Sequence, residues 1–443
     1  MISFGRTWRW FREAIRGREA GQTQRHRGRA RPARPTTNGL RCTAPEAHLP
    51  FLECGPPFST PTPPTPTSPP RQQHLDARPG CVGAWHGSSW RPRWRSGPSP
   101  ARRQSPFRWS WTGSFLDAMR LALAEDDAEN GPIAGLDTLL ILEVSNRAGP
   151  SLVVAQEMVD RPGMVAVVGH ANSTSSLATS QVYNRHRVVQ VAPTSTAPLF
   201  SEAGPYSFRM VPPDHVQGRF LAEKVAELAP EGARLALYYV NDDYGRALRT
   251  AVLPHLQPDR HPVVLDLPHS EGDVHEVNPE ELTAALVASG AHFVLWLGRV
   301  PALATFLPRA TSRVAPLTVL AGDAVSRAHL LFPLEGWWHG VSYTDFLDIT
   351  ATPELRDFRR RFQHSFDADP GGPEALVYDA TRAILAAIRG GARTGEEVRR
   401  SLSRLGAGAP PYPGITGPLT FDEHGDVVRD YVVRTIGPPG DAP

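Results

Sequence analysis

Residues 164–176 read MVAVVGHANSTSS, and this stretch decides the fold. Its first five residues form a short apolar run that stops at Gly169, which is typical of a strand buried on both faces. The hydroxyl-rich residues that begin at Ser173 are typical of the first turn of a helix. A buried strand that leads directly into a helix indicates a β–α–β unit, and therefore a parallel sheet covered by helices.

The alternation of helices and strands extends outward in both directions from this stretch. Around it, the sequence predicts a helix capped by Ser114 and ending near residue 130, a strand at 139–142, a helix at 153–159, a helix at 173–184 and a strand at 188–191. A second unit of similar plan restarts at Asp214: helix to 228, strand 235–240, helix from 243, strand 263–265, helix 280–289, strand 293–297, a helix, and strand 317–320. Two long helices follow at 353–366 and 373–389, and then an alternating segment at 414–436 with a turn at 422–426 between two strands.

This pattern predicts an α/β protein with two doubly wound parallel-sheet lobes. Ligands of such folds bind outside the carboxyl ends of the parallel strands, so we expect a cleft between the lobes with the binding residues on its rims.

The first quarter of the chain differs in composition from the rest. Residues 1–112 hold 19 Arg, no Lys and 5 acidic residues, for a net charge of +14, whereas residues 113–443 carry −12. The same quarter holds all three cysteines and a proline-rich stretch at 61–70. We therefore expect residues 1–112 to be a disordered Arg/Pro-rich tail. This composition also fits GC-rich DNA read from a wrong start or in a wrong frame.

Several classes of protein are excluded by the sequence. No stretch approaches the ~18 to 20 consecutive apolar residues of a membrane-spanning helix. Without a cysteine after residue 112, the folded part holds no disulfide, thiolate-bound zinc or catalytic cysteine. We expect no cofactor and no metal: the stretch 241–245, with its acids and amide, lacks the spaced partners of a calcium loop. The acidic body does not favour nucleic-acid binding, which only the Arg-rich tail would support.

Two hydroxyl-rich loops mark the predicted binding edge of the first lobe. Ser173 opens one helix, and Thr194 and Thr196 follow the next strand, so the loops share one edge of the sheet. Backbone N–H groups and hydroxyls at a helix start suit an anion such as a carboxylate, although helix capping alone would also place Ser or Thr there.

In the second lobe, Asp323 follows a strand and would face an ammonium group, or alternatively cap the next helix. Tyr244 would cover the ligand with its ring. His269 and His275 lie in an acidic loop, where we expect them to be solvated.

Six short motifs, in order along residues 114–436, resemble the type I periplasmic binding proteins, in particular the branched-chain amino acid receptors of ABC importers. They are Val165–His170 with Ser173, Val191–Pro198, Tyr206–Arg209 with Pro213–Asp214, Asp243–Gly245, Tyr378–Ala380, and Ile415–Asp422 with Gly425–Asp426. The resemblance implies the Venus-flytrap architecture, with crossovers near 211–215, 343–348 and 420–424. It divides the chain into lobe 1, at 113–213 plus 345–422, and lobe 2, at 214–344 plus 423–443.

The resemblance also implies the ligand contacts. Ser173 and Thr196 would bind the α-carboxylate, with backbone help from Thr194. Asp214 and Asp323 would lie near the α-amino group, and Tyr244 would pack on the ligand. Arg299 stands where relatives usually carry an aromatic residue, which leaves the preferred ligand side chain open.

A second departure from the family pattern lies ahead of Ser114. The family opens there with an apolar strand, and nothing in residues 91–112 reads as one. The signal peptide of an exported receptor is not visible in the same region.

The function that the resemblance implies is that of a non-enzymatic, solute-binding receptor of an ABC importer. It would close its lobes on a small amino acid or related carboxylate and deliver it to a membrane permease, at a periplasmic, extracellular or cell-surface location. The alternative is a sensor in which the same two-lobed module reports the ligand to a signalling partner.

Overall fold

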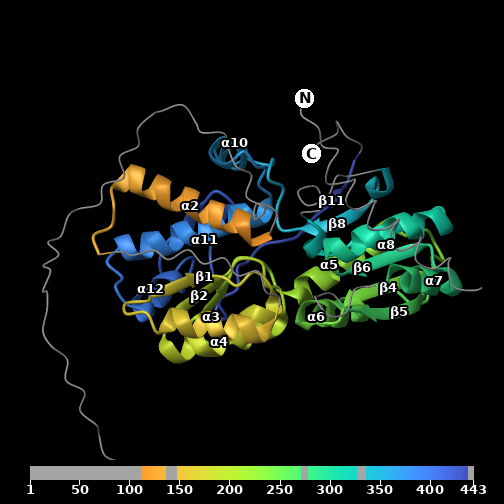
Figure 1. Ribbon diagram of the computed structural model, residues 1–443, viewed down its shortest axis with the longest axis horizontal. Coiled ribbons are helices and arrows are strands. Elements are labelled where there is room, and N and C mark those ends of the chain that lie inside the picture. Colours follow the sequence, from red (N-terminus) through yellow and green to blue (C-terminus); the bar gives the residue numbers. More distant parts are fainter. Residues whose placement is uncertain (1–110, 136–146, 271–277, 327–335, 438–443) are drawn as a thin grey trace, which may run out of the picture. The chain divides into compact units, whose positions relative to one another are not determined.

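A computed structural model describes residues 111–135, 147–270, 278–326 and 336–437. Over these residues the chain forms two mostly parallel sheets, each packed with helices (Figure 1), so the predicted α/β class with two parallel-sheet lobes is confirmed. The predicted tail before residue 111 and the predicted strand at 139–142 lie outside the described residues.

The first lobe is built on a parallel sheet whose described strands run in the order β1-β2-β3. These strands are β1 (Ala166–Val168), β2 (Val189–Ala192) and β3 (Ser207–Arg209). The lobe's helices are α2 (Trp111–Asn130), α3 (Ala148–Val159), α4 (Ser173–His186), η2 (Pro198–Glu202), α10 (Pro353–Phe366), α11 (Gly372–Arg389) and α12 (Gly395–Leu402). A separate hairpin pairs β9 (Tyr412–Gly414) with β10 (Gly417–Leu419).

The second lobe is built on a sheet in the order β11-β8-β7-β6-β4-β5, in which only the β11–β8 pair is antiparallel. Its strands are β4 (Leu235–Val240), β5 (Val263–His269), β6 (Phe293–Leu297), β7 (Thr318–Ala321), β8 (Ser342–Asp345) and β11 (Val432–Thr435). Its helices are α5 (Asp214–Leu228), α6 (Asp243–Val252), η3 (Leu253–His255), α7 (Pro279–Ser289), α8 (Val300–Arg313), η4 (Asp323–Val325) and η5 (Gly336–Trp338).

The continuous apolar strands of the second lobe are explained by two cores, one on each face of the sheet. Successive strand side chains point to opposite faces. Leu235 and Leu237 of β4 therefore pack with α5 and α6, whereas Ala236 and Tyr238 pack with α7 and α8. Because helices cover both faces of the sheet, the side chains on both faces must be apolar. Consecutive residues of each strand are therefore apolar, which gives an uninterrupted run.

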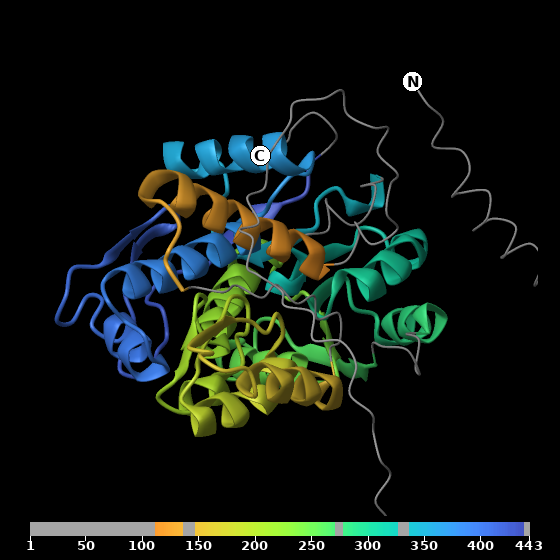
Figure 2. The ribbon, with the colours of Figure 1, turned by 60° about the vertical axis from the view of Figure 1, so that its left-hand side comes forward.

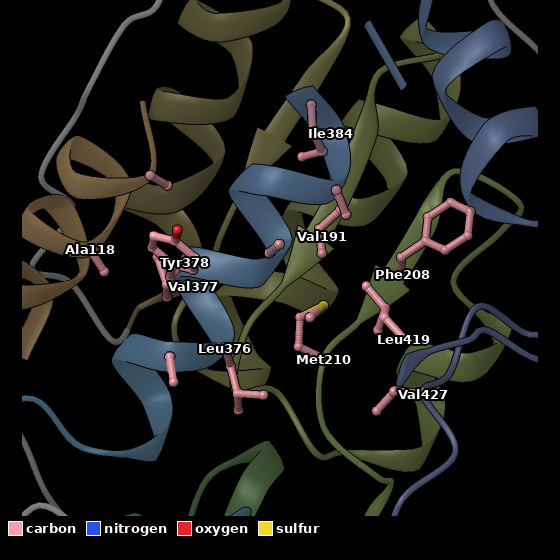
Figure 3. Close-up of a cluster of buried hydrophobic side chains, with 14 of the residues drawn as sticks. Ala118, Val191, Phe208, Met210, Leu376, Val377, Tyr378, Ile384, Leu419 and Val427 are labelled. Atoms are coloured by element: carbon pink, nitrogen blue, oxygen red, sulfur yellow. The ribbon is translucent and has the colours of Figure 1, made fainter. Parts of the chain in front are cut away.

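The core of the first lobe is centred on α11, which is buried along most of its length. Figure 3 shows Val377 and Ile384 of this helix among side chains from strands β2 and β3 and from the later segment that carries Leu419. Helix α2 lies between α10 and α11 (Figure 2), and ion pairs link its acids to both, including Glu125 to Arg361.

Three local predictions were wrong. Helix α2 starts at Trp111, so Ser114 is inside it, and the Ser114 hydroxyl donates to Glu374 Oε1 at 2.6 Å instead of capping. His269 is not solvated: it is buried and stacks on Trp296, with ring centroids 4.7 Å apart. The turn at 422–426 is closed by a single bridge between Phe421 and Val427, not by two strands. His275 lies outside the described residues.

The chain passes between the two sheets in three places. It leaves β3 for α5, leaves β8 for α10, and passes from Val427, in the core of the first lobe, to β11. Two hydrogen bonds hold the first connection: the Asp214 N–H donates at 2.8 Å to the Thr196 carbonyl in the loop after β2, and the Tyr431 hydroxyl of the third connection donates at 2.8 Å to the Pro212 carbonyl. The residue boundaries predicted for the lobes stay predictions.

Candidate ligand-binding site

Ser173 is placed to join two loops of the first lobe. It is the first residue of α4, but the cap of this helix is Asn172, whose side chain accepts from the Ser175 N–H at 3.0 Å. Capping therefore does not occupy Ser173. Its buried hydroxyl instead accepts from the Ala197 N–H at 3.2 Å, which ties the start of α4 to the loop after β2.

The loop after β2 carries Thr194 and Thr196, and their side chains differ in role. The Thr194 hydroxyl donates to the Ala171 carbonyl at 2.6 Å, so it holds the two loops together. Thr196 is fully buried, and its hydroxyl has no hydrogen-bond partner within 3.5 Å in the described part of the chain, although it lies near enough to Asp214 to lower the pKa of that carboxyl. A buried hydroxyl without a partner costs free energy unless something outside the protein bonds it.

Asp214 begins α5, directly after the first connection between the lobes. Its side chain is fully buried, and among the described residues neither of its carboxylate oxygens has a hydrogen-bond partner. Burial raises the pKa of this carboxyl well above its usual range, and the nearby Thr196 hydroxyl and Arg209 offset only part of that rise. Arg209 is already committed to Asp426, at 2.6 Å.

Asp323 is held by two donors from the second lobe. The cap of η4 is Gly322, so Asp323 is not required for capping. Its Oδ1 accepts from Gln217 Nε2 at 2.8 Å and from the Tyr244 hydroxyl at 3.0 Å. Burial raises the pKa of Asp323 to about 6, while the two donors and the charge of Arg299 act in the opposite direction.

Tyr244 and Arg299 are locked together through Asp242. Asp242 caps α6 by accepting from the N–H groups of Tyr244 and Gly245. Its second oxygen accepts from Arg299 Nη2 at 2.6 Å, and the Arg299 guanidinium lies 5.7 Å from the Tyr244 ring centre. The ring that we expected to pack on a ligand therefore contacts a cation of the same lobe.

The seven predicted residues form two hydrogen-bonded groups, and a charge interaction between Asp214 and Asp323 links one group to the other. Ser173, Thr194, Thr196 and Asp214 share the bonds around the loop after β2, and Tyr244, Arg299 and Asp323 share those around η4. The charge of Asp323 raises the pKa of Asp214, so the groups lie near one another. Their roles toward a ligand stay predictions.

Sequence reasoning missed Gln217 and a buried hydroxyl pair. The Ser176 and Ser195 hydroxyls are 2.7 Å apart beneath the two loops of the first lobe. Gln217 is fully buried one turn after Asp214 and bonds Asp323 directly. The spacing of Gln217 from Asp214, which puts both on one helix face, was the available signal.

The described part of the site carries two buried acids. Neither Asp214 nor Asp323 forms an ion pair with another described residue, and the nearby cations Arg299 and Arg209 pair with Asp242 and Asp426. The loops of the first lobe, which reach Asp214 through the Thr196 carbonyl, carry neutral hydroxyl groups. Such an arrangement suits a ligand with a positive group at one end and a negative group at the other.

A separate hollow in the first lobe does not suit a charged ligand. Apolar side chains of α2, α3 and β1 line it, together with Gly169, His170, Ala171 and Pro193. None of the predicted site residues takes part.

Within the described ranges, no group of three or more His, Cys, Asp or Glu side chains is placed to hold a metal ion. In the same ranges, no helix combines the length and apolar character that crossing a bilayer requires.

The family model of the periplasmic binding proteins matches residues 103–441, more than half of the chain. The chain belongs to the type I periplasmic binding protein family. Members of this family are solute-binding proteins, and they act in the periplasm or outside the cell.

Two curated relatives illustrate the similarity within the family. An amino acid binding protein of Pseudomonas aeruginosa is 26% identical over 319 residues, which covers 70% of this chain and 82% of that protein. A leucine-specific-binding protein of Salmonella typhimurium is 24% identical over 322 residues, covering 72% of this chain and 84% of that protein.

Solved structures support the fold. The branched-chain amino acid transporter substrate-binding protein LivJ of Streptococcus pneumoniae, solved in complex with isoleucine, superposes with a TM-score of 0.65 at 17% identity, over 74% of this chain and 94% of that one. A leucine binding protein of Thermotoga maritima superposes with the same score at 19% identity, over 75% and 93% of the two chains.

Proposed function

We propose that this periplasmic binding protein is the solute-binding receptor of an ABC importer, and that its ligand is a small amino acid or a closely related carboxylate. Ser173 and Thr196 bind the ligand carboxylate, with backbone help from Thr194. Asp214 and Asp323 receive the ammonium group, and Tyr244 and Arg299 line the space for the ligand side chain.

The observation that carries this proposal is the state of Asp214. A fully buried carboxyl with no partner for either oxygen is costly, and the cost is removed when a cation bonds it. An ammonium group supplies both the charge and up to three N–H donors.

Features of the first lobe support the proposed contact with the ligand carboxylate. The Thr196 hydroxyl has no partner in the described chain, and the first turn of α4 offers N–H groups that favour an anion. A carboxylate bonded there would lie on the first lobe while the ammonium lies on the second.

Ligand entry requires the lobes to separate. Asp214 and Thr196 are enclosed here, so a solute reaches them only if the connections after β3, β8 and Val427 allow the lobes to open. Closure is then favoured because only the closed state bonds both ends of the ligand.

The relatives' names suggest branched-chain amino acids as the first ligands to test. Differential scanning fluorimetry of the full chain with leucine, isoleucine and valine, the matching amine-free carboxylates and the matching carboxyl-free amines will test the class. We expect amino acids to raise the melting temperature, and the two kinds of half-ligand to raise it much less. If no amino acid or carboxylate raises it, the proposed ligand class is wrong.

The partner that we propose is a membrane permease, which would receive the ligand at a periplasmic or cell-surface location. A signalling partner is the alternative. Reconstitution with the permease encoded nearest to this chain, followed by ligand uptake into vesicles, separates the two.

We expect no reaction at the site, because in the described residues no histidine hydrogen-bonds the Ser173 or Thr196 hydroxyl to activate it. Recovery of the bound ligand unchanged after prolonged incubation would agree with this.

A further inference from the structure

Gln217 occupies a position that no role in ligand contact explains. Its side chain is fully buried on α5, and its Nε2 donates to two acceptors, Asp323 Oδ1 at 2.8 Å and Thr344 Oγ1 at 2.6 Å. Thr344 lies on β8, one residue before the connection that leads back to the first lobe. One amide therefore bonds the acid of the ligand site and the strand at the crossover.

The orientation of this amide is set by its nitrogen. In the described chain Gln217 Oε1 is buried without any donor, although an amide oxygen normally accepts hydrogen bonds. The reversed amide would leave that oxygen facing the Asp323 oxygen, and two acceptors repel each other. In the observed orientation Gln217 donates to Asp323, and an N–H bonds an ionised carboxylate more strongly than a protonated carboxyl.

We infer that Gln217 is a positioning residue, which keeps the Asp323 carboxylate ionised and fixed in the direction that an ammonium group needs. This inference rests on the proposed function, and it adds the residue that makes cation binding effective at neutral pH. A hydrogen bond to the charged form favours that form, so its loss should move the pKa of the acid upward by about one to two pH units.

The other ionisable groups near Asp323 come from every element packed around η4. They are Asp214 on α5, Asp242 and Tyr244 at the start of α6, Arg299 at the start of α8, Asp345 on β8 and Tyr431 before β11. Arg299 and the Tyr244 hydroxyl favour the ionised acid, whereas the neighbouring carboxyls oppose it. The Arg299 guanidinium bonds Asp242. The groups that hydrogen-bond Asp323 directly are two neutral donors, Gln217 and Tyr244.

The test is the pH dependence of leucine affinity, measured by calorimetry from pH 5 to pH 9 on the full chain. Gln217→Met keeps the side-chain volume and removes the donor. We expect the midpoint of the affinity curve to move at least one pH unit toward alkaline pH. With the Asp323 pKa at about 6, a one-unit move lowers the affinity at pH 7 about twofold and a two-unit move about tenfold, and most of this loss is recovered at pH 9.

Gln190→Met is the matched control. Gln190 is also fully buried, lies in the first lobe, and donates to Thr179 Oγ1 at 3.2 Å instead of to an acid. Its loss can weaken binding but should leave the midpoint unchanged. If Gln217→Met does not fold, Gln217→Asn, which is one methylene shorter, should give the same shift.

A double variant separates positioning from general damage. Because Gln217 acts through Asp323, Gln217→Met in an Asp323→Asn background should cause no further shift with pH. An unchanged midpoint in the Gln217 variants, or an equal shift in Gln190→Met, overturns the inference. If leucine, isoleucine and valine all fail to bind the unmodified protein, the proposed ligand class fails instead, so the two failures are distinguishable.

Discussion

The two rims of the candidate site use different chemistry to organise buried polar groups. On the first lobe, Ser173 and Thr194 bond backbone groups of neighbouring loops, and no charge is involved. On the second lobe, Asp242, Arg299 and Asp323 form a charged network with Tyr244. A neutral rim that donates hydrogen bonds favours an anion, and an acidic rim favours a cation. The difference therefore predicts which end of a zwitterion meets each lobe.

The largest expected effect is from removing the charge of Asp323. In Asp323→Asn the amide oxygen still accepts from Gln217 and Tyr244, but the negative charge is lost. Loss of one partner from a buried charge pair costs about 2 to 5 kcal/mol, so affinity for amino acids should fall roughly 30-fold or more. Calorimetry with an amine-free analogue is the control, and an equal loss for that analogue would contradict a cation role for the second lobe.

The second expected effect concerns the stability of the unliganded protein. Burial raises the pKa of Asp323 to about 6 and that of Asp345 to about 7, against 3.8 for an unperturbed Asp. Unfolded carboxyls lose their protons near pH 4, so between pH 4 and pH 7 the folded state holds more protons. The Asp323 shift alone corresponds to about 3 kcal/mol, so the free energy of unfolding should fall by at least about that much as the pH rises through this window.

Urea denaturation at pH 4.5, 6.0 and 7.5 measures this slope. Because the Ser173 hydroxyl does not titrate there, Asp345→Asn should flatten the slope and Ser173→Ala should not. A slope that survives unchanged in both Asp323→Asn and Asp345→Asn would place its origin elsewhere.

A smaller effect is expected from the first lobe. Ser173→Ala and Thr196→Ala each remove one hydrogen bond to a charged carboxylate, which costs about 1.5 to 3 kcal/mol, or roughly 10- to 150-fold in affinity. The loss should be absent for a carboxyl-free amine, the reverse of the pattern for Asp323→Asn. Thermal unfolding of the empty variants checks that the fold is kept. Unchanged affinity in both variants would remove the first lobe from carboxylate binding.

The smallest expected effect is from Arg299→Met. Its guanidinium pairs with Asp242, contacts the Tyr244 ring and lowers the Asp323 pKa, so it acts on ligand binding through neighbours. We expect a loss of about 1 kcal/mol, near fivefold, for aliphatic amino acids. A much larger loss for acidic amino acids alone would indicate direct contact between Arg299 and the ligand side chain.

How well the sequence predicted the fold depended on the kind of segment. Strands β4 and β6 and helices α5 and α10 have the predicted bounds, because their apolar patterns are bounded by polar or turn residues. Strands β3 and β8 were not predicted, because their sequences, SFR and SYTD, show no apolar periodicity. Both strands are nevertheless buried in the folded protein. The polar helix α12 was missed as well.

For the site as well, residues that follow a clear sequence pattern were predicted and those without such a pattern were not. Strand ends place Ser173, Thr196 and Asp323 on sheet edges, and the family resemblance pointed to Asp214. Gln217 was missed because its spacing from Asp214 places both on one helix face but does not show that Gln217 bonds a buried acid. That distinction depends on η4 and β8, which come more than 100 residues later in the chain.

The order in which the strands occur along the chain has a consequence for synthesis on the ribosome. Strand β8 is completed on one side by β11, at residues 432–435. Until those last residues leave the exit tunnel, β8 presents an open edge to the crowded surroundings, and such edges pair readily with strands of other chains. A product released early by a premature stop after residue 400 would keep that edge open permanently. Quality-control proteases should therefore remove truncated chains much faster than full-length ones.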